Sequence, residues 1–148
     1  AGRRGDRVPT PRVALHQRHG RKPAFRINNE SDVQDLLGGV LKMHFDDVRP
    51  EEWTPSYAVN ASRIDFLLKR KKIAVETKMT RQGLGQKEVA NELAVDILRY
   101  QAHQDCKTLI CFVYDPTGRC TNPAALENDL TREHGDLHVV VIVRPRNR

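Results

Sequence analysis

The chain has 148 residues, of which 39% are hydrophobic and 30% charged, and its formal net charge is +6. This length suits one domain with a buried core, and the composition excludes an intrinsically disordered chain, while no apolar run approaches the roughly 18 residues of a membrane span. Three cysteines without a CxxC pair argue against a disulfide framework or a zinc site and, with no signal-peptide pattern, favour a reducing, cytoplasmic setting.

Residues 1–24 form a basic segment that carries the whole net charge. They contain seven of the 25 Lys and Arg residues but one of the 19 acidic residues, Asp6, so residues 25–148 carry 18 of each. Such a segment either binds phosphates or is a solvated linker, and the sequence leaves both possibilities open. We therefore expect a basic arm or linker over residues 1–28 and one domain over residues 29–148.

The first predicted element is a helix over Glu30–His44, whose apolar residues recur at helical spacing. Asn29 or Ser31 is suited to cap its start. The pair Gly38 and Gly39 weakens the helix, which indicates close packing against a neighbour or a bend. After the helix, Phe45–Val48 is expected to form a short extended piece, and Pro50–Pro55 a turn or loop.

The remaining elements alternate between strands and helices. Two strands, Arg63–Leu68 and Lys72–Lys78, are expected to flank a basic turn, and the remaining strands show β-branched or apolar runs. The run Thr108–Tyr114 lacks alternation, which indicates a fully buried strand. The later elements are a helix over Gln86–His103, the strand Thr108–Tyr114, a helix over Asn122–Arg132 and a strand over Leu137–Val143. A hairpin followed by two crossover units predicts an α/β fold.

The pattern that carries chemistry is Asp65, ten intervening residues, and then Glu76-Thr77-Lys78. Two carboxylates on adjacent strands can bind a hard divalent cation such as Mg²⁺, to which the Thr77 carbonyl can add a ligand. Lys78, two residues after Glu76 in a strand, projects from the same face and can orient a water or stabilise charge on a phosphate. By spacing alone, however, an acid followed by E-x-K also arises by chance in so charged a chain.

The first predicted helix can contribute to the same site. Glu30 and Gln34 are four residues apart and therefore share a helix face. We expect them to reach the metal site directly or through water, although Glu30 is equally suited to stabilise the helix start. Asp96 and Tyr100 repeat this spacing on the long helix, where Tyr100 contacts a phosphate or is a core aromatic.

Further candidates for contact with nucleic acid are basic. Arg63, Arg81 and Lys87 are suited to bind phosphates, as is the turn around Arg70, and such contacts position a nucleic acid without specifying its sequence. A solvated surface charge is the ordinary alternative for each. None of the six histidines shows a metal-ligand spacing, which argues against a histidine-based phosphodiesterase.

At these residues the sequence resembles the PD-(D/E)XK nuclease superfamily, and more closely its DpnII/MboI-like restriction endonuclease domains. The resemblance covers about residues 30 to 144. Its motifs are Phe45–Glu52 (FDDVRPEE), Ser62–Leu68 (SRIDFLL), Val75–Lys78 (VETK), Asp96–Tyr100 (DILRY) and Phe112–Pro116 (FVYDP). Two features depart from the pattern: Asp65 follows Ile64 rather than proline, and residues 1–24 match nothing in it.

The resemblance implies a restriction-endonuclease-like mixed sheet flanked by helices. It also implies metal ligation at Asp65 and Glu76 and a catalytic Lys78, with Glu30 or Gln34 contributing. It implies an Mg²⁺-dependent endonuclease acting on DNA, for which Mn²⁺ can substitute. We expect a homodimer or a larger assembly, since cutting two strands usually needs two sites, and an effector domain of a prokaryotic restriction or anti-phage system. The alternative is a catalytically silent module that binds nucleic acid or a partner protein.

Overall fold

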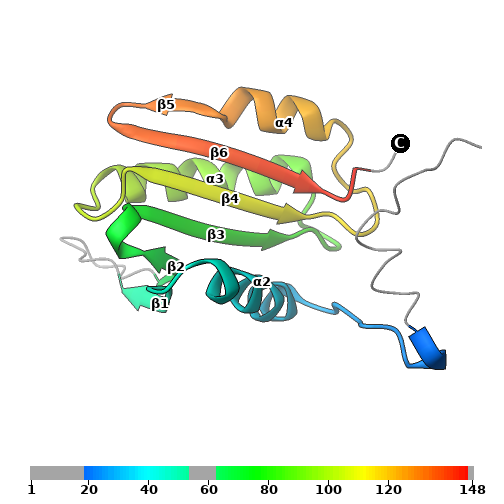
Figure 1. Ribbon diagram of the computed structural model, residues 1–148. Coiled ribbons are helices and arrows are strands. Elements are labelled where there is room, and N and C mark those ends of the chain that lie inside the picture. Colours follow the sequence, from blue (N-terminus) through cyan, green and yellow to red (C-terminus); the bar gives the residue numbers. More distant parts are fainter. Residues whose placement is uncertain (1–18, 54–62, 147–148) are drawn as a thin grey trace, which may run out of the picture.

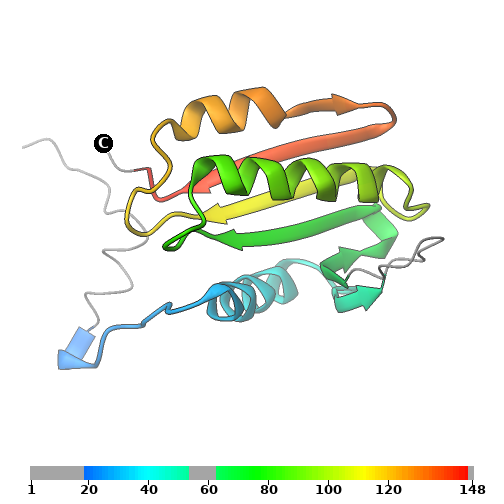
Figure 2. The same cartoon turned by 180° about the vertical axis from the view of Figure 1, so that it is seen from behind.

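The computed structural model describes residues 19–53 and 63–146, and gives the backbone alone for residues 51–53 and 63. These residues form a mixed six-stranded sheet with helices on both faces (Figures 1 and 2), which confirms the predicted α/β fold. In the part of the chain described, no helix is both long and apolar enough to cross a membrane.

The sheet has the strand order β1-β2-β3-β4-β6-β5. The neighbours β3, β4 and β6 run parallel, and the remaining neighbouring pairs are antiparallel. The bounds are β1 Arg49–Trp53, β2 Arg63–Leu68, β3 Ile73–Met79, β4 Thr108–Tyr114, β5 Arg132–His134 and β6 Leu137–Arg144. The predicted hairpin is thus β2–β3, and the two crossovers are β3 to β4 through α3 and β4 to β6 through α4.

Within the described residues, three α-helices flank the sheet, each with a capped start. The Oδ1 of Asn29 accepts the Asp32 amide at 2.9 Å, and the Glu88 carboxylate accepts the Gly85 amide. The Oδ1 of Asn122 accepts the Ala125 amide at 3.0 Å. These contacts satisfy amides that a helix start leaves unpaired. The helices are α2 Glu30–His44, α3 Gln86–Gln101 and α4 Pro123–Leu130, with 3-10 turns η1 His19–Arg21 and η2 Lys69–Lys71.

Two apolar layers separate the helices from the sheet. On one face, α2 packs through Leu37 and Leu41 on Phe66 and Val75 of β2 and β3. On the other face, α3 and α4 cover the larger core, which contains Leu93 among its fully buried residues. Figure 1 shows α2 in front of the sheet, and Figure 2 shows α3 and α4 on the opposite side. The hairpin β2–β3 is therefore enclosed between α2 and α3.

The segment after α2 differs in part from the expectation. Phe45 follows the helix with an extended backbone, but the predicted extended piece Phe45–Val48 forms no strand. The strand begins at Arg49 and runs to Trp53, across most of the predicted loop Pro50–Pro55, whose last two residues lie outside the described residues. Because β1 is an edge strand, it tolerates Pro50, which has no amide to donate to a ladder.

Two helix ends and the burial of one strand also differ from the prediction. The helix α3 ends at Gln101 rather than His103, and α4 ends at Leu130, so that Arg132 begins the unpredicted strand β5. The strand β4 is not fully buried: Leu109, Cys111 and Val113 are buried under α3, whereas the alternating residues are half-buried. The half-buried residues of β4 lie on the face where, among the described elements, α2 covers mainly β2 and β3.

Candidate active site

Asp65 lies where the β2–β3 hairpin opens. The paired residues of β2 and β3 run from Leu68 and Ile73 to Phe66 and Val75. Beyond this last pair, the carboxylate of Asp65 accepts the backbone amide of Thr77. Oδ2 of Asp65 accepts this N–H at 2.8 Å and the Thr77 hydroxyl at 2.7 Å, while Oδ1 accepts Nε2 of Gln34 at 3.1 Å. The side chain is therefore fixed from both β3 and α2.

Glu76 faces the opposite helix, α3. The hydroxyl of Tyr100 donates to its Oε1, and the two residues are 1% and 5% exposed respectively. Burial and the neighbouring Glu76 charge raise the pKa of Tyr100, so the phenol stays a hydrogen-bond donor. Tyr100 is a buried aromatic with a bonded hydroxyl, as the second of the two alternatives considered has it.

Lys78 also faces α3, where it lies between two acids. Its Nζ is 3.2 Å from Oδ2 of Asp96 and 3.4 Å from Oε2 of Glu92, and its side chain is 14% exposed. The Arg99 guanidinium contacts the other oxygen of Asp96 at 3.0 Å. Burial alone would lower the pKa of Lys78, but Asp96 and Glu76 raise it above its ordinary value. Lys78 is thus a fixed cation at the end of β3.

Glu30 approaches the same strand end from α2. Its Oε2 accepts the backbone amide of Met79 at 3.2 Å. Burial raises the pKa of Glu30, opposed by the Met79 amide and the Lys78 charge. The structure therefore brings together all five residues expected to share a site, namely Glu30, Gln34, Asp65, Glu76 and Lys78.

The carboxylates of this site repel one another. Burial raises the pKa of Glu76 to about 8, with a further contribution from the charge of Asp65. Burial also raises the pKa of Asp65, opposed by the two hydrogen bonds from Thr77 and by Lys78. A partly buried carboxylate pair of this kind favours a bound cation, because a cation offsets the cost of keeping both groups ionised.

The donor set fits a magnesium ion that keeps part of its water shell. Within residues 19–53 and 63–146, no group of three or more His, Cys, Asp or Glu side chains is arranged to enclose a metal. Mg²⁺ commonly uses one or two protein carboxylates and takes its other ligands from water and substrate phosphate. The carboxylates of Asp65 and Glu76 match that pattern, and the Thr77 carbonyl is the further ligand expected from the sequence.

The basic residues expected to contact nucleic acid differ in where they lie relative to this end of β3. Arg81 is exposed two residues after β3, and Lys87 is exposed in the first turn of α3. Arg63 begins β2, but its side chain lies outside the described residues, as does most of the basic arm. Lys69 and Lys71 precede β3, so the basic turn lies at the opposite end of that strand from Lys78.

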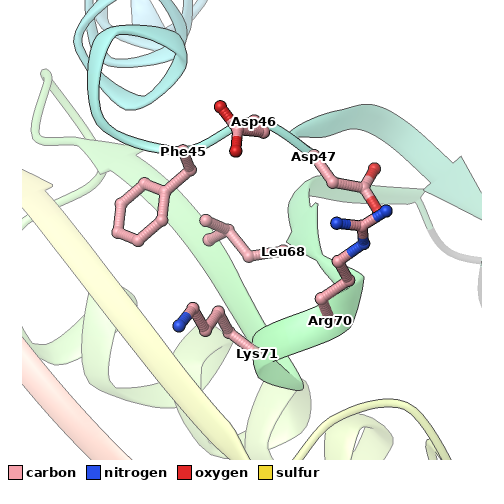
Figure 3. A pocket seen from close by; sticks show the side chains of 6 residues that line it. All are labelled: Phe45, Asp46, Asp47, Leu68, Arg70 and Lys71. Carbon is pink, nitrogen blue, oxygen red and sulfur yellow. The ribbon is translucent and has the colours of Figure 1, made fainter.

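A groove opens beside Asp65. It has a volume of about 170 Å³ and lies between α2 and the β1–β2 edge. A larger cavity of about 280 Å³ lies at the start of β1 beside the basic turn. Figure 3 shows Phe45 and Leu68 facing this cavity and Arg70 reaching toward Asp47. The groove lining is Gln34, Asp35, Gly38, Gly39, Lys42, Pro50, Asp65 and Phe66. Of the two hollows, only the groove includes an expected site residue.

Glu92 is the site neighbour that the sequence analysis missed. It lies four residues before Asp96 and eight before Tyr100, so all three share the face of α3 that contacts β3. Its 45% exposed side chain resembles any surface acid. The four-residue spacing was the available signal, but the sequence does not show that this face meets Lys78.

The comparison with known families agrees with the fold. The model of the DpnII-MboI restriction endonuclease family (REase_DpnII-MboI) matches residues 8–146. The match begins inside the basic segment, which corrects the expectation that residues 1–24 lie outside the resemblance, while the division at residue 28 stays a prediction. No curated protein and no solved structure matches the chain. From the match across most of its length, we conclude that this chain belongs to the DpnII-MboI restriction endonuclease family.

Proposed function

We propose that this chain is a divalent-metal-dependent endonuclease that hydrolyses phosphodiester bonds in DNA. The observation that carries the proposal is the convergence of Asp65, Glu76 and Lys78 at one end of the β2–β3 hairpin, in a chain of a restriction endonuclease family. Asp65 and Glu76 would bind Mg²⁺ or Mn²⁺. When bound, the metal activates a water and stabilises charge on the phosphoryl oxygens.

The protein residues supply orientation and charge. Thr77 and Gln34 together donate three hydrogen bonds to Asp65, which fixes the direction of its carboxylate. Lys78 stays protonated between carboxylates, because their charges raise its pKa. A protonated lysine at this position is suited to stabilise negative charge on the phosphate under attack and to orient the water, rather than to remove a proton from it.

The groove beside Asp65 is the approach that we propose for the scissile strand. Gly39 lies on its wall, and nothing lies within 4 Å of where its Cβ would be, so a substrate backbone can approach α2 closely. Lys42, on the same wall, provides a cation for a phosphate near the site. Arg81 and Lys87, both exposed near the site, are further phosphate contacts in this proposal.

The biological setting is part of the same proposal. We propose an effector domain of a prokaryotic restriction or anti-phage system, acting as a homodimer or within a larger assembly, because cutting both strands requires two sites. The three cysteines of the chain are free and buried, which supports a reducing, cytoplasmic setting.

The alternative is a silent module that binds nucleic acid or a partner protein without cutting. The joint presence of Asp65, Glu76 and Lys78 favours an enzyme, since a module that only binds has no need of all three. We propose to incubate the protein with supercoiled plasmid, linear duplex, single-stranded DNA and RNA, each with Mg²⁺, Mn²⁺ or EDTA. Metal-dependent cuts in DNA support the endonuclease, whereas binding to DNA without cuts under every condition supports the silent module.

A further inference from the structure

We infer that Asp96 and Tyr100 of α3 are positioning residues, which fix Lys78 and Glu76 of β3 in the geometry needed for cleavage. This inference rests on the proposed function and extends it to a second helix. In it, Asp96 and Tyr100 act through their contacts with β3 and not through contact with the substrate.

The contacts follow the helical repeat. Glu92, Asp96 and Tyr100 are spaced by four residues, and each reaches a side chain of β3: the two acids reach Lys78, and the phenol reaches Glu76. Glu76 and Lys78 are themselves two apart in a strand and share a face. One face of α3 therefore contacts the two side chains of β3, Glu76 and Lys78, that carry the proposed function.

Tyr100 limits how Glu76 can be arranged. The phenol donates its single proton to Oε1, which leaves Oε2 of Glu76 for a cation. Both side chains are almost fully buried, so neither can exchange this bond for one to bulk water. A hydrogen bond of this kind to a metal-binding group orients it, and loss of such a partner typically costs about 10- to 100-fold in metal affinity or activity.

Asp96 has the corresponding relation to Lys78. It is 4% exposed, its Oδ1 accepts from Arg99, and its Oδ2 lies 3.2 Å from Nζ of Lys78. The other acid beside Lys78, Glu92, is 45% exposed and therefore less constrained. Asp96 is thus the group that determines the direction of the lysine side chain, while Arg99 in turn holds Asp96.

The test compares Tyr100→Phe and Asp96→Asn with the wild type and with Leu98→Gln. Leu98 lies on the same helix but is 70% exposed, so its substitution is a matched control. For each folded protein we would measure kcat, KM for duplex DNA and the Mg²⁺ concentration at half-maximal rate. We expect each of the two variants to lose about 10- to 100-fold in kcat, with KM for DNA within about twofold of wild type. Leu98→Gln should be unchanged.

Further measurements separate positioning from a purely structural effect. Rates are expressed per folded molecule, with the folded fraction taken from thermal denaturation. Asp96→Glu keeps the carboxylate, so it should recover part of the kcat that Asp96→Asn loses. Folded Tyr100→Phe and Asp96→Asn proteins with kcat within twofold of wild type would overturn the inference alone, as would a loss confined to KM. A wild-type protein that cuts no substrate would overturn the proposed function and this inference with it.

Discussion

Gly38 of α2 packs directly on the ring of Phe66 in β2. A Cβ at Gly38 would lie 2.9 Å from Cε1 of that ring, closer than side chains normally approach. The absence of a side chain lets α2 lie near the hairpin, so that Gln34, one turn earlier, reaches Asp65. A glycine in the middle of a helix is therefore linked to the geometry of the candidate active site.

This relation predicts opposite effects for two neighbouring glycines. Gly38→Ala should destabilise the protein by about 1 kcal/mol, since the buried Phe66 must shift, and the overpacking cost of about 1–3 kcal/mol exceeds the gain in helix propensity. Gly39→Ala has open space around its Cβ and should stabilise the protein by up to about 1 kcal/mol. Urea denaturation of both variants checks this, and equal effects at the two positions would contradict it.

The stability of the metal-free protein should depend on pH through Glu76. Its pKa is about 8 in the folded protein against an ordinary 4.5, so the folded state binds more protons than the unfolded state between these values. Stability is therefore greatest at the acidic side of this window and falls as pH rises toward 8, by an amount on the order of a few kcal/mol. Asp65 and Glu30, whose pKa values are also raised, act in the same direction.

Thermal denaturation in EDTA from pH 5 to pH 8.5 measures this dependence. Glu76→Gln removes the largest contribution, so its profile should be flatter and the variant more stable than wild type at pH 8.5. Asp129→Asn, at an exposed acid of α4, should follow the wild-type profile. A Glu76→Gln profile as steep as that of wild type would show that Glu76 ionises normally in the folded protein.

Gln34 should matter for cleavage more than for folding. Gln34→Ala removes the hydrogen bond to Oδ1 of Asp65 and leaves the two bonds from Thr77, so the carboxylate keeps its place but loses one restraint. We expect a loss of about 10-fold in kcat, as for other partners that orient a metal ligand. Ser31→Ala, at an exposed position of the same helix, should cleave like wild type, and an equal loss there would point to a general effect on α2.

Lys42 should contribute to the binding of DNA. If the groove beside Asp65 receives the scissile strand, Lys42→Ala should weaken binding and reduce the slope of log affinity against log salt by about 0.9, the value for one phosphate contact. Lys107→Ala is the control. Lys107 is exposed just before β4, at the end of the parallel strands opposite to Lys78. Equal salt dependence for wild type and Lys42→Ala would place the DNA elsewhere.

Much of the fold could be predicted from the sequence because its main elements have clear periodicity. The turn between β2 and β3 sets their antiparallel register, and this brings Asp65 next to β3 residue Thr77. The strand β5 was missed because three residues are too few for periodicity. The strand β1 was missed because Pro50 and its acidic neighbours are typical of loops.

The candidate site was predictable only in part, for a physical reason. The spacing of two residues in a predicted strand or helix shows whether their side chains share a face. It does not show which residues that face contacts. Asp96 and Tyr100 were recognised as one face of α3, yet their partners Lys78 and Glu76 depend on how the helix is placed over the sheet. For the same reason the sequence left both alternatives open for Tyr100, since its burial depends on tertiary packing.

The central claim is that Asp65 and Glu76 bind the metal that drives cleavage of DNA. The most direct test is the rate of plasmid cleavage as a function of Mg²⁺ concentration for wild type, Asp65→Asn and Glu76→Gln, with Asp47→Asn as the control. Asp47 is a carboxylate beside the other cavity (Figure 3). A hydrogen bond from the Arg49 guanidinium lowers its pKa. We expect saturable Mg²⁺-dependent cleavage by wild type and Asp47→Asn, and none by folded Asp65→Asn or Glu76→Gln. Cleavage by those two variants at the wild-type rate would contradict the claim.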